Sequence, residues 1–268
     1  MATNQKTVLI AKNLADVLYH TKTVNNLQIL GGGTAVDEIK DKTVTLRHLS
    51  ELTTIEKRER YIDFGSAVTL QQIINLGENK VPPFFYDALL SVGSRPLRNF
   101  ATLGGNICAG PIKHTLYAPL LALNARLEFK KEKDTLYLPF VNFKEIPEKY
   151  VLTKIRVPLD DWEVSVFKRV GPERMITSDS ASFVFLVDTQ KNMIANIKIV
   201  FAGPVVFSFS SLENKLIGNK LPMNKKDIDS IVTEAKILWE TNFKAEPTNK
   251  ILKEQFLNLL EDSLSQLS

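Results

Sequence analysis

Two glycine clusters, each beside a threonine, hold the residues of this sequence best suited to bind a ligand. The glycines at 31–33 precede Thr34, and Thr102 comes just before Gly104, Gly105 and Asn106. Backbone N–H groups without side chains can form a concave nest for the oxygens of an anion, and a neighbouring hydroxyl adds a donor. We expect the two clusters to hold a diphosphate from both sides, although a lone glycine turn after a strand is more often a tight connection.

Neither cluster has the spacing of the two commonest nucleotide-binding loops. The residues after Gly31 do not follow the G-x-G-x-x-G pattern of dinucleotide-binding folds, and no Gly-Lys-Ser/Thr of a Walker loop follows them. The expected diphosphate therefore needs another kind of binding fold.

The composition is that of a globular chain with a substantial core. Of the 268 residues, 44% are hydrophobic and 24% are charged, and the formal net charge is +4. The basic runs at 56–60 and 130–134 also contain acidic residues, so we interpret them as solvated hairpin tips and predict no nucleic-acid partner. No apolar run approaches the roughly 20 residues that span a bilayer, so no membrane association is predicted.

Cys108 is the only cysteine. A disulfide within the chain is impossible, and a zinc or iron–sulfur site with cysteine ligands is not expected here. The N-terminal residues lack the basic start, apolar block and cleavage site of a secretory signal peptide. We predict a cytoplasmic protein without a metal site.

Hydrophobic periodicity predicts an α+β protein of three consecutive segments. The first has strand patterns at 7–11, 27–30 and 43–49 and a helix capped by Asn13, which is typical of a parallel β-α-β unit. The second is predicted to contain a strand at 61–65, helices after Thr69, at 82–93 and at 118–125, a hairpin over 125–143 and a strand at 151–158.

The third segment is predicted to be a meander of strands followed by helices. Strand patterns occur at 163–170, 180–188 and 194–203, and helical spacing at 225–242 and 249–267.

Five stretches together resemble the FAD-binding subunit of the molybdenum hydroxylases, a family that includes xanthine dehydrogenase and carbon monoxide dehydrogenase. They are, in order, "LGGGTAV", "SVGSRPLRNFATLGGNICAGP", "APLLALNARLEF", "VLTKIRVP" and "VFKRV". The second stretch, with "RNFATLGGN", is the most specific, and the resemblance extends over nearly the full chain. It implies the two-subdomain FAD-binding fold of vanillyl-alcohol oxidase and p-cresol methylhydroxylase, plus a C-terminal α+β domain with an antiparallel sheet and helices. The corresponding ranges are 1–55, 56–160 and 161–268.

The resemblance also implies which residues contact FAD, while each of them has a structural alternative. Val92 and Leu152 could be plain core, Lys168 an ordinary exposed lysine, Cys108 a small buried hydrophobe, and Arg98 a structural residue. The implied contacts are Ile29, Leu30, Gly31, Gly32, Gly33, Thr34, Val36, Val92, Thr102, Gly105, Asn106, Cys108, Ala109, His114, Leu152 and Lys168.

The sequence departs from the family pattern at two places. Ala35 stands where the family usually has an acidic residue, and His114 or a neighbour stands where it has an aspartate that fixes the polar part of the cofactor. Lys113 and His114 would put positive charge near a diphosphate, or a ribose contact could be lost.

The implied function is electron transfer without a catalytic residue in this chain. Electrons would pass from a molybdopterin-binding large subunit, through the [2Fe–2S] clusters of a small subunit, to FAD here and then to an acceptor such as NAD. Two alternatives stay open: a scaffold subunit with a degenerate FAD site, and a stand-alone flavin reductase. The reductase would need a protonating Ser or Cys and a Glu in motifs that we do not find.

Overall fold

The fold is described from a computed structural model that covers residues 7–110, 112–173, 175–244 and 250–268. The chain divides into two compact units, and each is described by itself. The first consists of residues 1–81, 93–110 and 123–160, and the second of residues 82–92, 111–122 and 161–268. The predicted division into 1–55, 56–160 and 161–268 stays a prediction.

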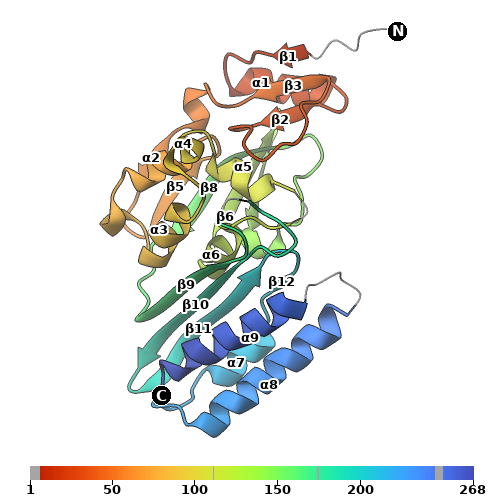
Figure 1. Cartoon of the computed structure of the whole chain (residues 1–268). Coiled ribbons are helices and arrows are strands. Elements are labelled where there is room, and N and C mark those ends of the chain that lie inside the picture. Colours follow the sequence, from red (N-terminus) through yellow and green to blue (C-terminus); the bar gives the residue numbers. More distant parts are fainter. Residues whose placement is uncertain (1–6, 111, 174, 245–249) are drawn as a thin grey trace. The chain divides into compact units, whose positions relative to one another are not determined.

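A small parallel sheet begins the first unit (Figure 1). It has the strand order β1 (Thr7–Leu9), β3 (Lys42–Thr45), β2 (Gln28–Leu30). Helix α1 (Leu14–Thr23) crosses between β1 and β2, and its N-terminus is capped by the Asn13 side chain. The helix buries Val17 against Val44 of β3. The predicted β-α-β unit is therefore confirmed.

An antiparallel five-stranded sheet forms the rest of the first unit. Its strand order is β4 (Ile55–Lys57), β5 (Tyr61–Gly65), β8 (Val151–Pro158), β6 (Arg126–Lys131), β7 (Asp134–Pro139). Its short helices are η1 (Ser50–Leu52), α2 (Leu70–Ile74), η2 (Glu78–Lys80), α4 (Arg95–Arg98), α5 (Leu103–Cys108) and η3 (Phe140–Asn142). Alternation along β6 and β8 buries Leu127, Phe129, Ile155 and Val157 on one face and leaves a polar face opposite.

The second unit has an antiparallel four-stranded sheet in the order β12 (Val206–Phe207), β11 (Met193–Ala202), β10 (Ala181–Gln190), β9 (Val164–Val170). Its helices are α3 (Pro83–Leu90), α6 (Tyr117–Ala122), α7 (Ser210–Leu216), α8 (Lys225–Asn242) and α9 (Lys250–Ser265). The predicted meander and both terminal helices are confirmed over the described residues.

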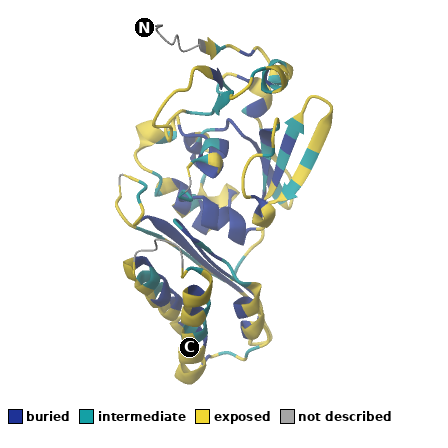
Figure 2. Ribbon diagram, turned by 90° about the vertical axis from the view of Figure 1, so that its right-hand side faces the viewer, coloured by how far each residue is buried: buried dark blue, intermediate teal, exposed yellow. Residues whose placement is uncertain are grey.

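Helices cover both faces of this sheet, which explains its apolar sequence. Helix α3 packs on β9 and α6 on β10 and β11, while α7 and α9 also contact the sheet. All of residues 181–187 are therefore buried, where one-sided packing would bury every second residue. Figure 2 shows these strands in dark blue and the last helices with a yellow outer side. Phe207 and Trp239 both contact Phe256 in this core, with ring centroids 4.4 and 5.3 Å from that of Phe256; the Phe207 ring is tilted against it and the Trp239 ring is stacked on it.

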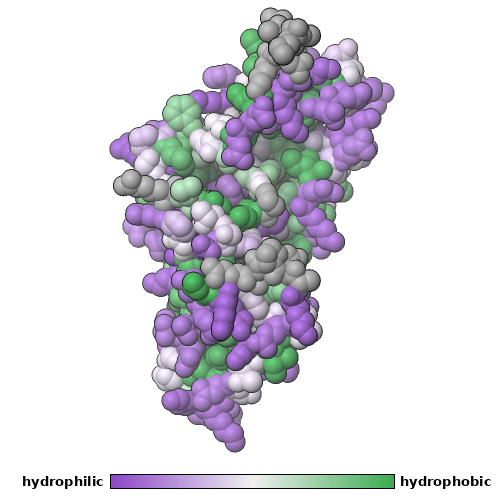
Figure 3. All heavy atoms as spheres, turned by 45° about the vertical axis from the view of Figure 1, so that its right-hand side comes forward, coloured by the Kyte–Doolittle hydropathy of each residue, from purple (hydrophilic) through white to green (hydrophobic). Residues whose placement is uncertain are grey.

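The surface is mixed in polarity. On the face drawn in Figure 3, hydrophobic residues are interrupted by hydrophilic ones. No helix among the described residues is both long and apolar enough to cross a bilayer.

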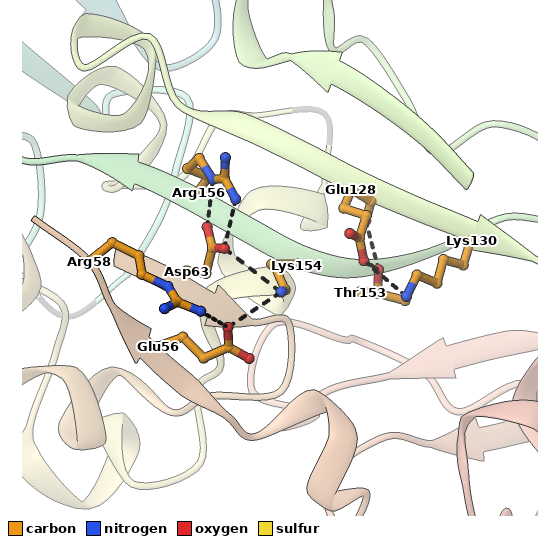
Figure 4. Close-up of polar contacts among 8 residues, drawn as sticks. All are labelled: Glu56, Arg58, Asp63, Glu128, Lys130, Thr153, Lys154 and Arg156. Atoms are coloured by element: carbon orange, nitrogen blue, oxygen red, sulfur yellow. Dashed lines mark hydrogen bonds and ion pairs between the residues drawn. The ribbon is translucent and has the colours of Figure 1, made fainter. Parts of the chain in front are cut away.

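A carboxylate on the polar face of the five-stranded sheet is almost fully enclosed by cations (Figure 4). Asp63 of β5 lies opposite Arg156 of β8, which donates from Nε and Nη2 at 2.7 and 2.9 Å. Lys154 Nζ lies 3.7 Å from the same carboxylate, and the Arg156 guanidinium also covers the Tyr61 ring at 3.8 Å. Asp63 is 4% exposed, so these contacts replace most of its hydration.

Asp63→Asn should lower the free energy of unfolding by about 1–3 kcal/mol, because it removes a charge-assisted pair from a buried acceptor. Glu56→Gln is the matched control, since the Glu56 side chain is 45% exposed and its cations lie 3.7 and 4.0 Å away; we expect a change below about 0.5 kcal/mol. Urea unfolding followed by far-UV circular dichroism measures both. Equal stability of the two variants would contradict this account.

Candidate cofactor site

The two glycine clusters are in direct contact within the first unit. A Cβ atom at Gly31 would overlap the Thr102 hydroxyl, and one at Gly32 would overlap the carbonyl oxygen of Phe100. Only glycine lets the two backbones approach this closely. At Gly31 and Gly32 there is no room for a ligand between the segments, so a ligand of both clusters would lie beside their contact.

The first cluster keeps its N–H groups available. Among the described residues, the N–H groups of Gly31, Gly32 and Gly33 donate to no protein acceptor. Gly33 has φ +69°, and no atom lies within 4 Å of the place where its Cβ would be. Thr34 follows as an exposed residue with a hydroxyl. Unpaired successive donors beside open space match the anion nest that was predicted.

The second cluster differs from the prediction. Its residues form the start of helix α5, and the Thr102 side chain caps this helix by accepting from the Gly105 N–H at 3.1 Å. The Leu103 N–H donates to the carbonyl of Val68 at 2.9 Å, and the Gly104 N–H donates to that of Ser66 at 3.0 Å. The expectation of a second N–H nest is therefore wrong, because protein acceptors already occupy these three donors.

The other predicted contacts of the first unit lie on elements that flank the two clusters. Ile29 and Leu30 end β2, and Val36 is exposed beyond the glycines. Asn106 is buried in α5, Cys108 is exposed at its end, and Ala109 is its half-buried C-cap residue. Leu152 is buried in β8, against which α5 packs.

Three predicted contacts belong to the second unit. Val92 follows α3 and is half-buried, and Lys168 is exposed on β9 opposite Phe183. Burial lowers the pKa of the His114 imidazole below its ordinary value, which disfavours its charged form. This direction counts against the expectation that His114 adds positive charge to the site.

Arg98 makes the contacts of a structural residue, which was the alternative given for it from the sequence. Its Nη1 donates to the Gly93 carbonyl at 2.6 Å, and its Nε lies 3.4 Å from the Gln71 side-chain oxygen. These contacts hold α4 against α2 in the first unit, before the chain enters the second cluster.

Two residues outside the glycine motifs belong to the same neighbourhood. Ser66 is 4% exposed, and its Oγ has no hydrogen-bond partner among the described residues. A Cβ on Gly104 would meet the Ser66 carbonyl oxygen at 2.7 Å. Arg47 stacks on Phe100, with Cζ 4.2 Å from the ring centroid. A turn serine and a lone arginine carry no distinctive spacing, so sequence reasoning missed both.

Gly32→Ala should lower the free energy of unfolding by about 3 kcal/mol, because the new methyl group forces two backbones apart. Gly33→Ala, in open space, should cost about 1 kcal/mol, since it only imposes a left-handed torsion on alanine. Urea denaturation of both variants tests the difference. A Gly32→Ala protein as stable as Gly33→Ala would show that the close contact does not hold the two clusters together.

Comparison with known proteins identifies the family. Residues 3–160 match the model of the FAD binding domain in molybdopterin dehydrogenase, which is more than half of the chain. A xanthine dehydrogenase FAD-binding subunit from Escherichia coli O157:H7 is 29% identical over 152 residues, which cover 53% of this chain and 52% of that protein. The nicotinate dehydrogenase FAD-subunit of Eubacterium barkeri is 22% identical, covering 96% of this chain and 94% of that one. The chain spans about half the length of the E. coli relative.

Solved structures agree on the fold. The whole chain superposes on CO dehydrogenase from Oligotropha carboxidovorans with a TM-score of 0.79 and 16% identity, covering 97% of that chain. Quinoline 2-oxidoreductase from Pseudomonas putida 86 gives 0.76 at 16% identity, with 100% of this chain and 96% of that one covered. The predicted fold class is thus confirmed.

The residues present fit FAD, the cofactor that this family binds. A diphosphate needs several donors beside open space, and the unpaired N–H groups of Gly31, Gly32 and Gly33 supply them. The predicted cofactor is therefore supported both by the family and by the form of the first glycine loop, and the chain belongs to the family of FAD-binding domains of molybdopterin dehydrogenases.

Proposed function

We propose that this chain is the FAD-binding electron-transfer subunit of a molybdenum hydroxylase. In this proposal the chain receives electrons from the [2Fe–2S] clusters of a small subunit. A molybdopterin-binding large subunit supplies the electrons to those clusters. This chain passes them to an acceptor such as NAD. The relatives' names describe FAD subunits, and Cys108, the single cysteine, supports placing the clusters in another chain.

One observation carries the proposal: the unpaired N–H groups of Gly31, Gly32 and Gly33, beside open space at Gly33. Bound FAD would supply the electron-carrying chemistry. The task of this chain is to hold the diphosphate with the first loop and to orient the rest of the cofactor with the predicted contacts Thr102, Gly105 and Asn106.

Further contacts are proposed on the basis of the resemblance. Leu30 and Thr34 would belong to the loop around the diphosphate, Ile29 and Val36 would line the adenosine and ribityl parts, and Cys108 and Ala109 would lie just beyond the second cluster. Val92 would pack near the flavin ring, Leu152 would be an apolar contact, Lys168 would lie near the flavin end, and His114 would be a polar contact. We keep the cytoplasm as the proposed location, since a chain with one cysteine can form no disulfide within itself.

The scaffold alternative has one observation in its favour. His114 is half-buried, and an imidazole, whether neutral or protonated, cannot supply the negative charge of the family's aspartate. A scaffold with a degenerate site would fold and assemble but would not bind FAD.

Titration of the purified chain with FAD, followed by flavin fluorescence and absorbance, separates the two functions. We expect saturable binding, and a roughly tenfold weaker affinity for Gly33→Ala, because alanine disfavours the left-handed torsion of Gly33 and misaligning one charge-assisted hydrogen bond costs about 1.4 kcal/mol. Gly218→Ala is the matched control, because Gly218 also has positive φ (+87°) and open space but lies in the second unit, after α7.

No binding by the wild-type chain would favour the scaffold. Equal affinity of wild type and Gly33→Ala would show that the first loop does not hold the diphosphate. Loss of flavin absorbance on adding NADH without oxygen would support NAD as the acceptor, and no loss would count against it.

A further inference from the structure

Arg47 lies at the contact between the two glycine clusters, although it belongs to neither motif. It comes just after β3, in the turn where the Leu46 N–H donates to the carbonyl of Leu30 at 2.8 Å. Leu30 immediately precedes Gly31. The backbone of Arg47 is therefore placed beside the start of the first glycine loop.

The side chain of Arg47 reaches the other cluster. Its guanidinium covers the Phe100 ring, with 4.2 Å between Cζ and the ring centroid. Phe100 is also the residue whose carbonyl oxygen fills the space beside Gly32. Arg47 thus contacts one of the two residues, Phe100 and Thr102, that meet the first loop.

The guanidinium has no acidic partner in the described part of the chain. The interactions of Arg47 there are the contact with Phe100 and a backbone N–H that lies 3.4 Å from the Thr45 hydroxyl. The neighbouring arginines of the first unit differ: Arg156 is paired with Asp63, and Arg98 donates to Gly93. Stacking on a ring fixes the plane of a guanidinium and leaves the N–H groups at its edge free to donate.

We propose that Arg47 is an anion-binding residue of the cofactor site, whose guanidinium donates hydrogen bonds to the diphosphate of the bound dinucleotide. The inference rests on the proposed function. It adds a cation to a site that otherwise offers the N–H groups of the first loop. It also supplies donors that the second cluster lacks, since Leu103, Gly104 and Gly105 use theirs within the protein. A planar guanidinium can bind two phosphate oxygens at once.

The alternative role for Arg47 is purely structural, as a cover for Phe100, which is 46% exposed. The two roles differ in their dependence on salt. A contact between a cation and a phosphate weakens as ionic strength rises. Loss of the cover over the Phe100 ring would instead change the FAD affinity equally at all salt concentrations.

The test measures the dissociation constant of FAD for the full chain at low and at high potassium chloride. Arg47→Gln should bind FAD about 10- to 100-fold more weakly than wild type at low salt, with a smaller difference at high salt. Arg47→Lys, which keeps the charge without the planar fork, should fall between them. Arg58→Gln is the matched control: Arg58 is an exposed arginine of the same unit, 3.7 Å from Glu56, and this variant should bind like wild type.

Phe100→Leu distinguishes the positioning of the Arg47 guanidinium from its charge, because this variant removes the ring on which the guanidinium stacks and keeps Arg47. We expect an intermediate loss of affinity that remains salt-dependent. Thermal unfolding without FAD checks that each variant is folded.

Four outcomes would overturn either the proposed function or the assignment of Arg47 to the FAD diphosphate. Failure of the wild-type chain to bind FAD at either salt concentration would overturn the proposed function. Wild-type FAD binding that Arg47→Gln leaves unchanged would overturn the assignment of Arg47 alone, as would a loss of equal size at both salt concentrations. If Arg47→Gln leaves FAD binding unchanged but weakens the reaction with NADH, Arg47 contacts NADH. That result would also overturn the assignment of Arg47 to FAD.

Discussion

The close backbone contact between Gly31 and Gly32 on one side and Phe100 and Thr102 on the other is the constraint on which the candidate site depends. It joins the end of a parallel sheet to the start of α5, two segments about seventy residues apart in the chain. Any side chain at Gly32 would separate them. The contact explains why two glycines must stand together here, and it brings the exposed edge of the first loop next to the second cluster.

The two clusters have different physical roles despite their similar composition. The first exposes unpaired N–H groups, which can bind an anion without side chains. The second uses its N–H groups to anchor α5 on Ser66 and Val68. Position 104 requires a glycine because α5 lies against the Ser66 backbone there, which leaves no room for a Cβ atom. In our proposal, the donors to a diphosphate come from the first loop and from Arg47. This division replaces the symmetrical clamp that the composition suggested.

Much of the fold could be predicted because its elements have strong local signals. Asn13 and Thr69 cap helices as expected, the alternating pattern over 125–143 predicted the hairpin of β6 and β7, and the strand patterns after residue 162 predicted the meander of β9, β10 and β11. The helical form of α5 was missed because glycine is a poor helix former, and its stability comes from tertiary hydrogen bonds. The positions of Ser66 and Arg47 are likewise set by packing between distant segments. The lowered pKa of His114 follows from burial, which residue type alone does not reveal.

Hydrogen–deuterium exchange of the first loop, measured with and without FAD, tests the central claim most directly. In the free chain the amides of Gly32, Gly33 and Thr34 have no protein acceptor among the described residues, so they should exchange quickly. FAD should slow the exchange of these amides, while those of Leu103 and Gly104, already bonded within the protein, should change much less. Unchanged exchange at residues 32–34 in a chain saturated with FAD would contradict the account, because the diphosphate would then be held elsewhere.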